Sequence, residues 1–126
     1  MNNSWKIAAG IAGGLFAVMG LVWLLAPGFV SSQMRMDLLT GDGLSTQIGD
    51  LASFFLTLGA CIAIALITMR PVWLYPPVML LGFAAAGRLI AWGVHGAGLA
   101  IDMILFEIVV ATLLFVVARK MDAAAQ

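Results

Sequence analysis

Four apolar runs, each long enough to cross a membrane, constrain this chain more than any other feature. They extend from Ile7 to Leu25, from Ile48 to Met69, from Val72 to about Val94, and from Leu99 to Ala118. A hydrocarbon core of about 30 Å needs about 20 apolar residues in a helix, and helices satisfy every backbone hydrogen bond there. The sequence therefore predicts four membrane-spanning helices.

The predicted fold is all-α, an integral membrane four-helix bundle that forms a single transmembrane domain over residues 1–126. The expected helices cover about residues 6–26, 48–69, 72–94 and 99–119.

Composition agrees with this class. Hydrophobic residues make up 63% of the chain and charged residues 10%, against about 25% charged in a soluble domain. Six basic and six acidic residues cancel, so the chain offers no basic surface for nucleic acid. One cysteine, Cys61, cannot form an internal disulfide, and one histidine without a second histidine or cysteine nearby argues against a metal site.

The connections differ in length. Arg70-Pro71 and the glycine turn from His95 to Gly98 are short, so the second, third and fourth helices form antiparallel hairpins. The first connection, Pro27 to Gln47, is one long outer loop. Its middle, from Ser31 to Leu39, is predicted to form a short helix on the membrane surface. This helix should end at Gly41-Asp42-Gly43. This loop is the candidate lid.

Basic residues near helix ends predict the orientation. Those on the side of the termini are Lys6, Arg70, Arg119 and Lys120, whereas the opposite side has Arg35 and His95. Positive residues concentrate on the cytoplasmic side, so both termini should be cytoplasmic and the long loop should face outward.

The ionisable groups within the helices all lie in the outer half. At 1.5 Å per residue, Arg88 is roughly 9 Å, Glu107 roughly 12 Å and Asp102 roughly 5 Å below the outer surface. Asp50 is near that surface and His95 marks its edge.

Arg88 and Glu107 lie at similar depth on antiparallel neighbours, and either charge alone is costly in lipid. We therefore expect a direct ion pair, with Asp102 nearer water or facing Asp50. The pair has two interpretations. It orients two helices, or it also contacts a ligand, substrate or proton.

Helical periodicity groups further side chains. Arg88, Trp92 and His95 lie on one stripe of the third helix. A mildly polar stripe on the second helix contains Asp50, Ser53, Thr57 and Cys61. If both stripes face inward, the candidate ligand-binding residues are Arg88, Glu107, Asp50, Asp102, Trp92, His95, Ser53 and Thr57.

Other interpretations of these residues stay open. For His95, which lies beside a glycine turn, a solvated loop histidine is the favoured interpretation. Trp92 is compatible with an interfacial anchor, the role expected of Trp5, Trp23, Trp73 and Tyr75. Small residues at Gly10-x-x-x-Gly14, Gly13 and Gly20, and at 84–87, would let backbones approach or leave room for a ligand.

The order of "GDLASFFLTLGACIAI", "GRLIAW", "HGAG" and "ILFEIVV" resembles the bacterial four-helix membrane proteins of domain-of-unknown-function family 4345. The resemblance covers nearly the whole chain, and the matching positions are Gly59, Gly87, Arg88 and Glu107. It implies a four-helix fold in the bacterial inner membrane and brings no established activity. The chain is more distantly similar to DoxX-like proteins, some of which are accessory subunits of quinone-linked oxidoreductases.

Three functions are compatible with these features. The first is binding of an amphipathic molecule, such as a lipid, quinone or isoprenoid, in an outward-facing polar pocket, as a homo-oligomer or within a larger membrane complex. The second is an intramembrane enzyme in which Glu107 or Asp102 acts as acid or base on a lipid. The third is proton-coupled transport by an oligomer. No cofactor motif is present.

Overall fold

The computed structural model describes residues 3–125, and within them it is all-helical. The elements are α1 (Ser4–Leu25), α2 (Pro27–Gln33), α3 (Gly41–Thr68), a 3-10 turn η1 (Pro71–Leu74), α4 (Tyr75–His95) and α5 (Ile101–Ala125). Four segments are long and apolar enough to cross a membrane, namely α1, α3, η1 with α4, and α5. The predicted all-α bundle of four membrane helices is confirmed.

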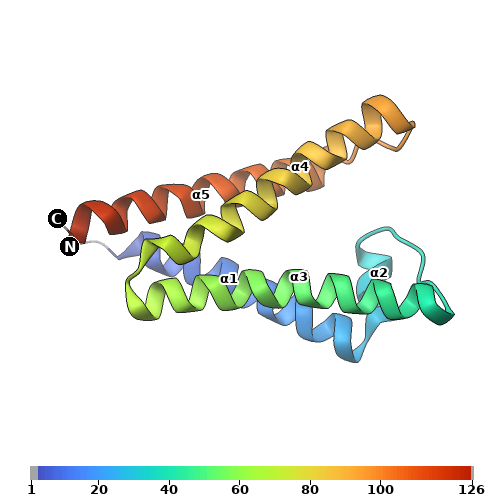
Figure 1. Cartoon of the computed structure of the whole chain (residues 1–126), viewed down its shortest axis with the longest axis horizontal. Coiled ribbons are helices and arrows are strands. Elements are labelled where there is room, and N and C mark those ends of the chain that lie inside the picture. Colours follow the sequence, from blue (N-terminus) through green and yellow to red (C-terminus); the bar gives the residue numbers. More distant parts are fainter. Residues whose placement is uncertain (1–2, 126) are drawn as a thin grey trace.

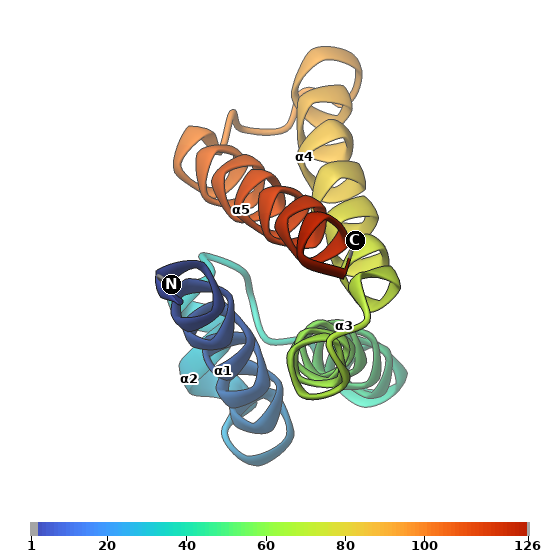
Figure 2. The same ribbon diagram turned by 90° about the vertical axis from the view of Figure 1, so that its left-hand side faces the viewer.

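The helices associate as two antiparallel pairs. α1 packs mainly on α3, and α4 mainly on α5, so Figure 2 shows one pair below the other. α1 begins and α5 ends at the same end of the molecule, and the two pairs separate towards the opposite end (Figure 1). The molecule is therefore a wedge whose narrow end contains the start of α1 and the end of α5.

The narrow end holds the two pairs together. η1 contacts both α3 and α5 there, and the core includes fully buried side chains from several elements. These are Ala9, Ile62, Ala65, Leu74, Leu114, Val117 and Ala118. Burial of Met121 in the same core explains why α5 continues beyond the predicted end at residue 119.

The connection between α1 and α3 differs from the prediction. Its short helix, α2, begins directly at Pro27, a favourable first helical residue because it has no N–H to satisfy. α3 begins at Gly41 rather than at residue 48. Gly41-Asp42-Gly43 starts a helix instead of ending one, and Asp42 in the first turn suits the positive end of the helix dipole.

Gln47 explains how the remaining loop is held. This buried side chain accepts a hydrogen bond from the Leu39 N–H at 2.9 Å and donates one to the Asp37 carbonyl at 3.0 Å. Arg35 has a positive φ of 57°, which turns the chain sharply after α2. The loop therefore folds back against α3 rather than extending away from the bundle.

Trp23 was expected at the membrane interface, and this prediction is wrong. Its side chain is fully buried in the core that α1, α2 and α3 share. Its indole N–H has no hydrogen-bond partner among the described residues. Trp5, Trp73 and Tyr75 remain at least partly accessible, as interfacial residues would be.

Candidate functional site

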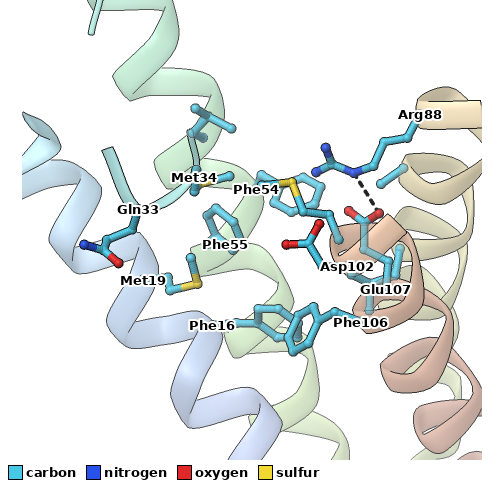
Figure 3. Close-up of a pocket in the computed structure, with 14 residues that line it drawn as sticks. Phe16, Met19, Gln33, Met34, Phe54, Phe55, Arg88, Asp102, Phe106 and Glu107 are labelled. Atoms are coloured by element: carbon cyan, nitrogen blue, oxygen red, sulfur yellow. Dashed lines mark hydrogen bonds and ion pairs between the residues drawn. The ribbon is translucent and has the colours of Figure 1, made fainter. Parts of the chain in front are cut away.

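A cavity of about 410 Å³ lies in the wedge between the two helix pairs. It is lined by residues of all five α-helices and of the loop after α2. Most of the lining is apolar. The apolar residues are Phe16, Met19, Met34, Leu51, Phe54, Phe55, Leu81, Ala84, Met103 and Phe106, and the polar ones are Gln33, Arg88, Asp102 and Glu107 (Figure 3).

Aromatic rings close the cavity towards the narrow end. Phe16 on α1 stacks on Phe55 of α3 with ring centroids 6.1 Å apart. It also meets Phe106 of α5 edge to face at 6.2 Å. Phe16 thus joins both helix pairs, and the cavity opens beyond it (Figure 3).

The predicted ion pair is present on one wall of this cavity. Arg88 Nε donates a hydrogen bond to Glu107 Oε1 at 2.9 Å, between α4 and α5. The Glu107 side chain is 9% exposed and the Arg88 side chain 33% exposed. The tight turn after α4 fixes the relative depth of the two residues, since Gly96 adopts the left-handed conformation (φ 71°) that ends α4.

Arg88 uses only one of its donors in this pair. A guanidinium group has five N–H donors, and the Nε–H is the one that contacts Glu107. The two terminal nitrogens have no hydrogen-bond partner among the described residues, and they point away from Glu107 towards the cavity (Figure 3). The pair therefore leaves donors available to a molecule in the cavity.

Asp102 has a partner that the sequence did not indicate. The two terminal nitrogens of Arg35 donate to the two carboxylate oxygens of Asp102 at 3.0 and 2.9 Å. The Asp102 side chain is 65% exposed, and the residue that it contacts is Arg35 rather than Asp50. Asp102 raises the pKa of the Arg35 guanidinium, first through the hydrogen bonds and then through its charge.

The Arg35–Asp102 pair spans the open end of the wedge, from the loop after α2 to the start of α5. Gln33 and Met34, just before Arg35, line the cavity. The segment that was expected to cover the polar residues thus reaches the cavity and contacts one of them, Asp102. The apolar face proposed for it is only partly correct, because Met34 faces the cavity whereas Leu38 and Leu39 are exposed.

The other predicted site residues do not line this cavity. Trp92 and His95 are exposed, because the outer part of α4 diverges from the other helix pair (Figure 1). On α3 the inward stripe is wrong for Asp50, Ser53 and Thr57, which are exposed, whereas Cys61 is buried. Asp50 borders a separate shallow groove beside the loop.

Sequence reasoning also missed residues that shape the site, namely Gln33, Arg35 and Gln47. The signal for Arg35 was its charge, since it is one of the few cations at the outer end. Its pairing depends on a loop conformation that no periodicity indicates.

Within residues 3–125 no group of three or more His, Cys, Asp or Glu side chains is arranged to hold a metal ion. Comparison with protein families, with characterised proteins and with solved structures finds no match.

Proposed function

We propose that this protein binds one amphipathic membrane molecule, such as a lipid, quinone or isoprenoid, in the cavity between its helix pairs. The polar end of the molecule contacts Arg88 and Glu107, and its apolar part packs against the aromatic side chains. The proposed binding residues are those that line the cavity. Five residues predicted from the sequence are not among them, namely Asp50, Ser53, Thr57, Trp92 and His95.

The observation that carries this proposal is the unused hydrogen-bonding capacity of Arg88 inside an apolar cavity. A pair that served only to join α4 and α5 would gain most from a bidentate contact closed by surrounding protein. Here the contact is through Nε alone, a third of the Arg88 side chain is exposed, and Arg88 lines the cavity. A bound polar group would satisfy donors that are otherwise unpaired.

Cavity size and lining support the same proposal. About 410 Å³ falls in the lower part of the roughly 300–1,000 Å³ typical of small-molecule sites, which are mostly apolar with a few polar groups. This suits one small amphiphile or one acyl chain rather than a complete two-chain phospholipid.

The resemblance to bacterial four-helix proteins supports a location in the bacterial inner membrane. The basic residues near the helix ends support cytoplasmic termini and an outward-facing cavity. The exposed apolar surface of α4, including Phe83, Ile90 and Val94, suits either lipid or neighbouring membrane subunits. We therefore include a role as an accessory subunit of a larger complex in the proposal.

Native mass spectrometry of the full-length protein, purified gently from its membrane, tests this function. We expect one bound amphiphile per chain in the wild type. The double variant Arg88→Met, Glu107→Gln should fold, since no charge is left unpaired, but should lose that molecule because its polar contacts are gone. A wild-type protein without a bound molecule, or a double variant that retains it fully, would reduce the pair to a link between helices.

A further inference from the structure

The charges around the cavity balance. Arg88 and Glu107 neutralise each other on one wall, and the bidentate contact with Arg35 neutralises Asp102. The remaining polar lining residue, Gln33, is uncharged. Two positive and two negative groups therefore give the site a net charge of zero.

A balanced site disfavours a charged guest. A net charge that enters a mostly apolar cavity loses its hydration and needs a counter-charge to offset that loss. An anion that approached the free nitrogens of Arg88 would also approach the Glu107 carboxylate, 2.9 Å from Arg88 Nε. A cation near Glu107 would in turn meet Arg88. Each charged head group thus gains one attraction and one repulsion.

The unused hydrogen-bonding groups have complementary polarity. Arg88 offers the N–H groups of its two terminal nitrogens, and Glu107 offers its second carboxylate oxygen, Oε2, which has no hydrogen-bond partner among the described residues. Both side chains face the same cavity (Figure 3). A hydroxyl group matches this arrangement because it accepts and donates at one oxygen.

We propose that the site selects an uncharged, hydroxyl-bearing head group on an apolar chain, and discriminates against anionic and cationic heads. The hydroxyl oxygen accepts from Arg88 and its proton is donated to Glu107. This inference rests on the proposed function, since it assigns a ligand class to the same cavity.

Three probes with the same tail separate head-group charge from chain length. Oleyl alcohol, oleyl sulfate and oleylamine are neutral, anionic and cationic at pH 7. The full-length protein, stripped of bound lipid in detergent, is incubated with an equimolar mixture and analysed by native mass spectrometry. We expect bound alcohol to exceed each charged probe by about tenfold, the factor expected from one hydrogen bond to a charged group.

Single variants should shift this order by altering the balance of charge. Glu107→Gln leaves the site with a net positive charge, so oleyl sulfate should become the preferred probe. Arg88→Gln leaves a net negative charge, so oleylamine should gain. Asp50→Asn is the matched control, because it removes one carboxylate near the outer surface that does not line the cavity, and it should leave the wild-type order unchanged.

The outcomes distinguish the two proposals. Oleyl alcohol first in the wild type supports the head-group inference even if a variant fails to fold. Oleyl sulfate or oleylamine first, or equal occupancy by all three, overturns the inference and leaves binding of an amphiphile intact. Retention of none of the probes removes both this inference and the proposed function.

Discussion

Glu107 is nearly buried on α5, and the cation that compensates it is Arg88 on α4. Removal of either side chain leaves the other charged and partly desolvated, or forces it to lose its charge. The Arg88 side chain is a third exposed, so the pair is not fully enclosed by protein. The pair should therefore be coupled, but less strongly than a fully enclosed one.

A double-mutant cycle measures this coupling. We expect Arg88→Met and Glu107→Gln each to lower the free energy of unfolding by about 1–3 kcal/mol, below the roughly 3–5 kcal/mol typical when a fully buried pair is broken. The double variant should be more stable than either single variant. Thermal unfolding of the wild type, both single variants and the double variant in one detergent, at equal protein concentration, would measure these stabilities. If the loss in the double variant equalled the sum of the two single losses, a direct interaction would be contradicted.

The sequence could predict this pair because two simple quantities determined it, the rise per helical residue and the short turn between α4 and α5. It could not predict the Arg35–Asp102 pair, because Arg35 lies in a loop with a left-handed backbone. It also placed Trp92 and His95 on an inward stripe, whereas both are exposed, as in the alternative interpretations of an interfacial anchor and a loop histidine. Helical periodicity indicates which residues share a face of a helix. It does not indicate at which residue that face stops packing against other helices.

The backbones of α1 and α3 approach each other closely. A Cβ atom at Gly59 would lie 2.9 Å from both the Ala17 nitrogen and the Gly13 carbonyl oxygen. A Cβ at Gly20 would lie 2.9 Å from the Leu56 nitrogen. Small residues therefore let these helices pack without a larger separation, as is common in membrane bundles.

Gly59→Ala should destabilise the protein by about 1–3 kcal/mol, since the added methyl group meets backbone that cannot move aside without separating the helices. Gly49→Ala, on the same helix, is the matched control. A Cβ there has no atom within 4 Å, so this change should be neutral or stabilise by up to about 1 kcal/mol through helix propensity. Unfolding midpoints of the two variants in detergent provide the comparison, and equal midpoints would argue against the close packing.

The glycines of α1 show that their spacing in the sequence does not identify which of them contact α3. The Gly10-x-x-x-Gly14 spacing suggested a close helix contact, yet a Cβ at Gly14 would meet nothing within 4 Å and one at Gly10 only a Leu66 methyl group at 3.8 Å. The close positions are Gly13 and Gly20, which are seven residues apart and so share a face. The partner surface on α3 decides which glycines are needed, and a single helix does not reveal it.

The whole molecule is a wedge because its two helix pairs pack tightly only at the narrow end. Fully buried residues such as Leu74 and Leu114 fill that end. Towards the other end the pairs diverge around the cavity, and the described polar contact between them there is Arg35–Asp102 (Figure 1). Four apolar runs were enough to predict the number of membrane helices. The cavity results from unequal packing between the pairs, which run length and composition do not encode.

The most direct test of a ligand in this cavity fills the space and leaves every charge in place. Ala84 lines the cavity, whereas Ala86 on the same helix borders a different groove between α4 and α5. We predict that Ala84→Phe loses the amphiphile seen by native mass spectrometry of the wild type, because the ring occupies its volume, while Ala86→Phe retains it. An Ala84→Phe protein that carries the same bound molecule, in the same amount as the wild type, would contradict binding in this cavity.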